Sequence, residues 1–259
     1  MCRFDRGLFI APLTGMELFP KTDTGFTVHA ESVPDAVSPK RAIKSYVLRA
    51  GRMSDAQQRS YEQFSPLYCL PFELGSLHYP KLFGNDNPVT IEIGFGMGIA
   101  TALIAEDNPD KNYIGLEVYR PGIGRLLWEI KKRNLHNIRI IEHDAVEVLG
   151  TMIKDHSVSA FHVFFPDPWP KKKHHKRRLI KRPFTDMLSQ KLLAGGYLYM
   201  VTDWADYGEW ALKELKETPM LQNSYDGFAE PQSWRPETKF ERKGMDKQHQ
   251  IRELFFNRK

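Results

Sequence analysis

The sequence has few cysteines and no long apolar run. Its 259 residues include only Cys2 and Cys69, with no CxxC or HExxH motif. These two cysteines suggest neither a disulfide framework nor a zinc site. No stretch approaches the roughly 18 consecutive apolar residues of a membrane-spanning helix. Pro12 interrupts the short apolar stretch near the start, which argues against a signal peptide. We therefore expect a cytoplasmic protein with no membrane association and no metal site.

Positive charge is concentrated in one segment. The net charge is +5, yet residues 171–182 (KKKHHKRRLIKR) contain eight Lys or Arg and no acidic residue, and the rest of the chain has a net charge of −3. A charge run is usually a solvated surface, but beside an active site it can hold the phosphates of a nucleic acid. Its like charges argue against an ordered conformation in the absence of RNA.

The chain is predicted to form one domain with an N-terminal extension. Residues 1–40 lack hydrophobic periodicity and are expected to be a flexible arm. Residues 41–259 are expected to form a single domain.

The first part of this domain is predicted to be a helix and then a loop. Ser54 and Gln57 make a capping box for a helix to about Phe64. Pro66 and Pro71 are expected to end it, and the predicted loop runs to Pro88.

Apolar, β-branched runs then alternate with helical patterns. This alternation predicts βαβ units, and hence a Rossmann-like α/β fold whose mostly parallel, seven-stranded sheet has helices on both faces. Six of the predicted strands have residue ranges that the sequence indicates. They are Val89–Ile93, Asn112–Glu117, Ile138–Glu142, Ala160–Phe165, Tyr197–Thr202 and Arg252–Asn257. The predicted helices are Ile99–Asp107, one ending near Arg133, Ala145–Lys154, one near Pro183–Leu193, and one ending within Leu212–Met220.

A glycine-rich turn follows the first of these strands (EIGFGMG, 92–98). Gly94 and Gly96 would let a ligand approach the backbone at the carboxyl edge of the sheet. The dinucleotide fingerprint GxGxxG would need a third glycine where Ile99 stands. The carboxylate of Glu92 would repel a pyrophosphate but attract an ammonium group. These features favour S-adenosylmethionine over NAD as the cofactor.

Three further acidic residues lie where strands end. Glu117 is placed to accept hydrogen bonds from ribose hydroxyls, and Asp144 from the adenine amino group. Asp167 would lie beside the methyl group of a bound S-adenosylmethionine. Each could instead be an ordinary loop acid, and Asp144 is also well placed as a helix N-cap. Four acids at successive strand ends make that simpler explanation weaker.

The loop Phe165–Lys171 (FPDPWPK) combines an acid, stiffening prolines and Trp169, which is the one tryptophan we expect to stack on a base. Guanine N7 is a candidate acceptor of the methyl group. It carries a lone pair and no proton, so its methylation needs no general base. Asp167 could hold the base and offset its developing positive charge. The adjacent basic run suits a single-stranded RNA loop as substrate.

Taken together, these motifs resemble the bacterial tRNA (guanine-N7-)-methyltransferase family. The similarity extends from about Arg41 to the C-terminus and excludes residues 1–40. The motifs are EIGFGMG, GLEVYRPG, DAVEVL, FFPDPWPKKKHHKRR, VTDW and RPETKFE. The resemblance implies a class I methyltransferase fold and methylation of the variable-loop guanine at tRNA position 46, with no obligate protein partner evident.

The resemblance also implies roles for individual residues, and Asp167 would be the catalytic one. The residues implied to bind the cofactor are Glu92, Gly94, Gly96, Glu117, Asp144 and Asp167. Those implied to bind the substrate are Lys171, Asp203, Thr238, Lys239, Phe240 and Glu241. Those implied to contact RNA are Lys173, His174, His175, Lys176, Arg177 and Arg178.

Other functions stay open at this stage. A Rossmann dehydrogenase is disfavoured by Glu92 and Ile99. A non-catalytic RNA-binding protein of the same fold would be expected to lose the cofactor acids, which are present. Another RNA or amino-group methyltransferase is also compatible with the motifs, whereas a protein or small-molecule methyltransferase leaves the basic run unexplained.

Overall fold

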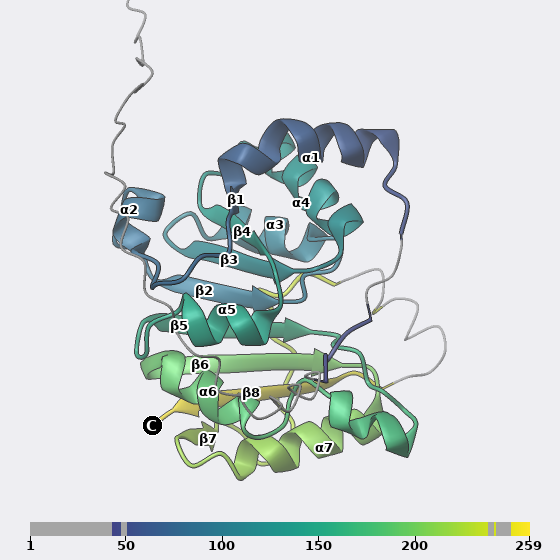
Figure 1. Cartoon of the computed structure of the whole chain (residues 1–259). Helices are drawn as coiled ribbons and strands as arrows, with labels where there is room; N and C mark the ends of the chain where they lie inside the picture. The colour runs from purple at the N-terminus through teal and green to yellow at the C-terminus, as the bar shows by residue number, and fades with distance from the viewer. Residues whose placement is uncertain (1–42, 48–50, 238–240, 242–249) are drawn as a thin grey trace, which may run out of the picture. The chain divides into compact units, whose positions relative to one another are not determined.

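A computed structural model describes residues 43–47, 51–237, 241 and 250–259 (Figure 1). The chain divides into two units, Met1–Arg41 and Ala42–Lys259. The predicted arm, 1–40, lies outside the described residues, and the rest of this section concerns the second unit.

The second unit is built on one mixed sheet with the strand order β1-β4-β3-β2-β5-β6-β8-β7. Strands β1 to β6 pair in parallel, whereas β8 pairs antiparallel with both β6 and β7. The strands are β1 (Cys69–Leu70), β2 (Val89–Ile93), β3 (Asn112–Glu117), β4 (Ile138–Glu142), β5 (Val158–Phe164), β6 (Leu192–Thr202), β7 (Leu221–Asn223) and β8 (Arg252–Arg258).

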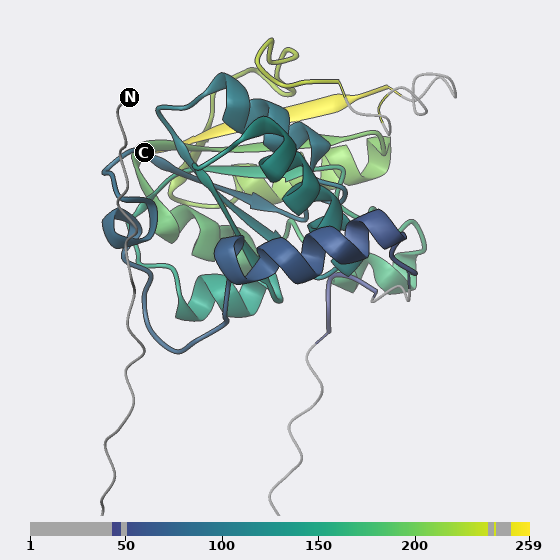
Figure 2. The same cartoon turned by 90° about the horizontal axis from the view of Figure 1, so that it is seen from above.

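Helices cover both faces of this sheet, as predicted. One face packs against α1, α3 and α4, and the other packs against α5, α6 and α7. In both views α1 runs beside α4, and α7 lies beside β7 and β8 (Figures 1 and 2). The helices are α1 (Asp55–Tyr68), α2 (Tyr79–Phe83), α3 (Ile99–Asp107), α4 (Arg120–Arg133), α5 (Ala145–Thr151), α6 (Phe184–Lys191) and α7 (Ala205–Lys216), with a 3₁₀ helix at Lys172–Arg177.

The two-residue alternation of the strands divides the core into two layers. In β2, Ile91 and Ile93 pack toward α5 and α6, so Glu92 between them faces α3. In β6, Tyr199 and Val201 point to the same side as Glu92. The sequence of each strand therefore decides which side chains reach the α3 face.

Three details of the predicted elements are corrected. The sheet has eight strands in the described residues, because β1 adds a two-residue parallel strand beside β4. The segment expected to be a loop up to Pro88 contains β1 and α2. Helix α1 continues through Pro66 to Tyr68. Pro66 has no N–H to donate to the carbonyl four residues earlier, so the helix loses one hydrogen bond there. Apolar packing of α1 residues such as Phe64 favours the helix despite this loss.

The described part of the chain contains neither a membrane-spanning helix nor a metal-binding cluster. None of its helices is long and apolar enough to cross a membrane. None of its His, Cys, Asp or Glu residues form a cluster able to hold a metal ion. Cys69 is a free thiol whose pKa burial raises to about 12, so it is unreactive at neutral pH. Cys2 lies outside the described residues.

Candidate active site

The predicted acids come together because the parallel strands end at one edge of the sheet. The register pairs Ile93 with Leu116 and Glu117 with Glu142, so β2, β3 and β4 end side by side. On the other side of β2, Phe164 of β5 pairs with Val201 of β6. The residues that follow these strand ends share one carboxyl edge, where ligands of open α/β sheets bind.

The glycine-rich turn opens a space at this edge. Gly94 and Gly96 have φ angles of 75° and 56°, in the left-handed region that glycine tolerates. A Cβ atom added at either position would meet no atom within 4 Å apart from the adjacent residues of the chain. The turn is fixed by the Gly94 amide, which donates to the Leu116 carbonyl at 2.8 Å. The open space in front of an exposed, rigid backbone fits the predicted cofactor cradle.

Glu92 is buried behind this turn, with 4% of its surface exposed. Burial raises the pKa of its carboxyl to about 7, and the nearby Glu117 carboxylate adds to the rise. A carboxylate placed in such surroundings has a strong electrostatic preference for a cationic partner. An ammonium group of a ligand would supply one.

Glu117 is held rigidly at the end of β3. Its Oε2 accepts a hydrogen bond from the Gly96 amide at 2.8 Å, and its Oε1 accepts from the amides of Val118 and Tyr119 at 2.7 and 3.1 Å. Burial raises its pKa, and these backbone donors partly offset the rise. The carboxylate therefore connects the glycine turn to β3 and keeps lone pairs that can accept from ligand hydroxyls.

Asp144 forms the helix N-cap considered for it, and its contact with adenine stays a prediction. Its Oδ1 caps α5 by accepting from the Val146 amide at 2.9 Å, and its Oδ2 lies 2.9 Å from Lys44 Nζ. Lys44 also contacts Glu147 at 2.6 Å. A hollow beside this ion pair is lined by Lys44, Tyr46, Val118, Glu142, His143, Asp144 and Glu147. Its position between the β3 and β4 ends suits an adenine ring.

Asp167 lies exposed on a tightly constrained loop. The loop is bounded by Phe165 and Trp169, whose φ angles of 50° and 46° are unusual for residues with side chains. The Phe165 amide donates to Val201 O at 2.8 Å, and Trp169 Nε1 donates to Ser45 O at 3.0 Å. The Asp167 carboxylate lies near enough to Glu117 to contribute to the rise in its pKa, so these two predicted residues lie close together.

The first half of the basic run presents its charges outward. Lys171, Lys173 and Lys176 are exposed, and His174 and His175 are partly buried. The Arg177 guanidinium lies 4.9 Å from the centre of the Trp169 ring. Contrary to our expectation, residues 172–177 form a 3₁₀ helix without RNA, because the following residues pack into the core and fix one end of the run.

Arg178 is a correction to the predicted RNA contacts. Its side chain is completely buried and forms an ion pair with Asp206. A guanidinium buried in this position cannot contact a phosphate of an RNA that binds at the surface. The RNA assignments of the other five residues, Lys173 to Arg177, stay predictions.

The substrate residues predicted after β6 are only partly described. Asp203 is partly buried directly after β6, at the same edge of the sheet. Thr238, Lys239 and Phe240 lie outside the described residues. Glu241 is 4% exposed, and Arg235 donates to both of its carboxylate oxygens at 2.6 and 2.7 Å. Arg235 also donates to Glu253 at 2.8 Å, so Glu241 belongs to a buried ionic network on β8.

Two residues of the site were not predicted to have a role. Lys44, which precedes α1, pairs with Asp144. Gly122 packs so closely on the cofactor turn that a Cβ there would lie 1.8 Å from the Gly96 carbonyl oxygen. Its place within the motif GLEVYRPG was a usable signal for Gly122, whereas no local pattern indicates the partner of Lys44.

Comparison with known proteins places the chain in a family. Residues 86–254 match a family model described as "Putative methyltransferase". The solved 16S rRNA methyltransferase KamB superposes with a TM-score of 0.53 at 13% identity, over 72% of this chain and 95% of that one, and this similarity concerns the fold alone.

Three sequence relatives carry the name tRNA (guanine-N(7)-)-methyltransferase. The protein of Methylobacillus flagellatus is 47% identical over 85% of this chain and 93% of its own length. That of Ralstonia pickettii is 45% identical over 92% of both chains, and that of Aromatoleum aromaticum is 41% identical over 93% of this chain and 99% of its own. At this identity and coverage, the chain belongs to the tRNA (guanine-N(7)-)-methyltransferase family.

Proposed function

We propose that this protein transfers the methyl group of S-adenosylmethionine to N7 of the guanine at position 46 in the variable loop of tRNA. The observation that carries the proposal is the meeting of Glu92, Glu117, Asp144 and Asp167 around an open glycine turn, beside an exposed basic segment. Membership of the family, and the tRNA that appears in the names of the relatives, support this choice of substrate. Because the substrate is tRNA, we place the protein in the cytoplasm.

The residues of the carboxyl edge can hold each part of the cofactor. Glu92 would face the ammonium group, Glu117 the ribose hydroxyls, and Asp144 the adenine amino group, while Gly94 and Gly96 leave room for the chain between them. The cofactor supplies an electrophilic methyl group on a sulfonium centre. Lys44 would have to release Asp144, or share it, when the adenine binds.

The protein's contribution to the reaction is mainly alignment. Guanine N7 attacks with its own lone pair, so no side chain has to remove a proton. Asp167 lies on a loop constrained at both ends, where its carboxylate can hold the base and lower the energy of the positive charge that develops on the purine. Glu241 is buried and bound by Arg235, so its predicted contact with the base would require this ion pair to open.

The exposed half of the basic run would bind the RNA backbone. Lys171, Lys173 and Lys176 follow the Asp167 loop directly, so phosphates bound by them flank a base inserted at that loop. Trp169 is half-buried, and its exposed part is available to stack on a base.

Cleavage at the modified nucleotide tests the proposal. A tRNA transcript is treated with the enzyme and S-adenosylmethionine, and then with borohydride and aniline, which cut RNA at 7-methylguanosine. We expect one cut at position 46, and none in a transcript with adenine there. Asp167→Ala should abolish the cut, whereas Asp155→Ala should not, because Asp155 pairs with Lys191 on α6, away from the loop. Cleavage at another guanine would refute the assignment of position 46.

A further inference from the structure

Arg178 has surroundings unlike those of the exposed lysines of the basic run. Its side chain has no exposed surface. Its Nε donates to the Pro168 carbonyl at 3.0 Å, and its guanidinium lies 5.1 Å from the ring centres of both Tyr207 and Trp210. These rings and Asp206 compensate the buried charge. Through Nε, the Arg178 guanidinium therefore binds the main chain of the residue next to Asp167.

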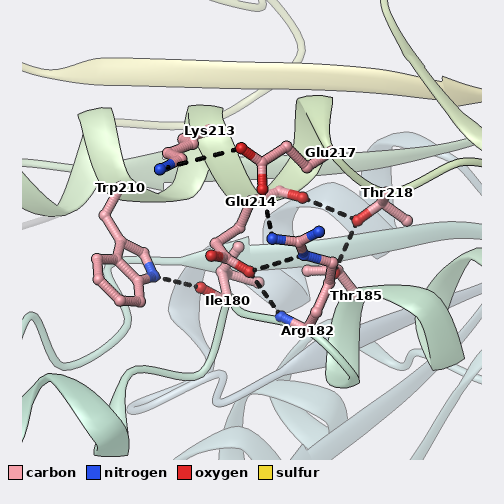
Figure 3. Close-up of polar contacts among 8 residues, drawn as sticks. All are labelled: Ile180, Arg182, Thr185, Trp210, Lys213, Glu214, Glu217 and Thr218. Carbon is pink, nitrogen blue, oxygen red and sulfur yellow. Dashed lines mark hydrogen bonds and ion pairs between the residues drawn. The ribbon is translucent and has the colours of Figure 1, made fainter.

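The residues after Arg178 form hydrogen bonds with successive turns of α7. The Ile180 amide donates to Tyr207 Oη at 3.0 Å, and Trp210 Nε1 donates to the Ile180 carbonyl at 3.0 Å. Figure 3 shows the continuation of this pairing, in which the Arg182 amide donates to Glu214 at 2.8 Å and the Arg182 guanidinium contacts Glu217.

This pairing divides the basic run into two functional halves. The side chains of Lys171 to Lys173 and of Lys176 are exposed, whereas Arg178 to Arg182 join the Asp167 loop to α7. Helix α7 begins at Ala205, directly after β6, and β6 is in register with β5, which precedes the loop. The loop is thus supported from the sheet through Phe165 and from α7 through Arg178.

We propose that Arg178 is a positioning residue for methyl transfer, which sets the main chain of the Asp167 loop through its bond to Pro168, and does not bind RNA. The inference rests on the proposed function, because the loop matters only if Asp167 aligns a base. A displacement of about 1 Å in such a loop can lower turnover by about 100-fold.

The test compares Arg178→Met with Lys176→Gln, a change at an exposed cation two residues earlier. Methionine fills a similar volume and leaves Asp206, whose side chain is 64% exposed, in water, so the fold should survive. We expect Arg178→Met to lower kcat by about 10- to 100-fold, with KM for tRNA and the salt dependence of tRNA binding unchanged. Lys176→Gln should raise KM and reduce the salt slope by about 1, with kcat unchanged.

An Arg178→Met protein with normal kcat, raised KM and a reduced salt slope would overturn the proposal, because those are the effects of a lost phosphate contact. If Arg178→Met does not fold, Asp206→Asn weakens the same support, and it should lower kcat without changing the salt slope. Hydrogen exchange at the Trp169 indole N–H, which donates to Ser45 O at 3.0 Å, gives a readout independent of turnover. It should accelerate in Arg178→Met but not in Lys176→Gln, even if the wild-type protein methylates a different nucleoside.

Discussion

Replacing Glu92 by glutamine should strengthen the fold and weaken cofactor binding at the same time. Burial raises the pKa of Glu92 from 4.5 to about 7. Between these values the folded protein keeps the proton while the unfolded chain releases it. The stability of the wild type therefore falls as pH rises through this window and is constant above it. At about 1.36 kcal/mol per pH unit, the full effect is roughly 3 kcal/mol.

Urea denaturation of wild type and Glu92→Gln between pH 5 and pH 8 measures this effect. The difference in unfolding free energy should shift by roughly 2–3 kcal/mol in favour of the variant over that range. Glu73→Gln, a change at an exposed glutamate, is the matched control and should show no such shift.

Calorimetry with S-adenosylhomocysteine, which carries the same ammonium group, tests the ligand side. The wild type should bind it roughly tenfold more weakly at pH 6 than at pH 8, since the ionised form of Glu92 is needed. Glu92→Gln should bind weakly at both values. A variant that binds as tightly as wild type at pH 8, or a stability difference that does not change with pH, would refute this role of Glu92.

Three further substitutions test how closely individual residues are packed or paired. Gly122→Ala should destabilise the protein by about 1–3 kcal/mol and weaken S-adenosylhomocysteine binding, since its Cβ would collide with the Gly96 carbonyl. Gly150→Ala, in α5 with open space around it, should be neutral or stabilising by up to about 1 kcal/mol in urea denaturation, and it should leave S-adenosylhomocysteine binding unchanged in calorimetry. Arg235→Met should cost about 3–5 kcal/mol in urea denaturation, because it removes the guanidinium that pairs with the buried carboxylates of Glu241 and Glu253, and equal stability of variant and wild type would contradict that account.

The sequence predicted the parts of the fold that depend on local periodicity. The helices Ile99–Asp107 and Arg120–Arg133, and the strands β2, β3 and β4, lie where the alternation of apolar residues indicated them. Strands β1 and β7 have two and three residues, too few to produce a pattern, and they form because a neighbouring strand offers hydrogen-bonding groups.

The site was predictable where it follows strand ends and less so where it depends on tertiary contacts. Parallel strands bring Glu92, Glu117, Asp144 and Asp167 to one edge, and strand order alone is enough to infer this. The burial of Arg178 was not predictable, because it depends on rings of α7 about thirty residues away in sequence. A local charge pattern cannot distinguish a cation that faces solvent from one that supports a loop.

The most direct test of the central claim is the transfer of labelled methyl groups from S-adenosylmethionine to unmodified tRNA, followed by nucleoside mass spectrometry. The account predicts 7-methylguanosine as the labelled product with the wild type and no labelled product with Asp167→Ala. A different methylated nucleoside, or equal labelling by Asp167→Ala, would contradict it.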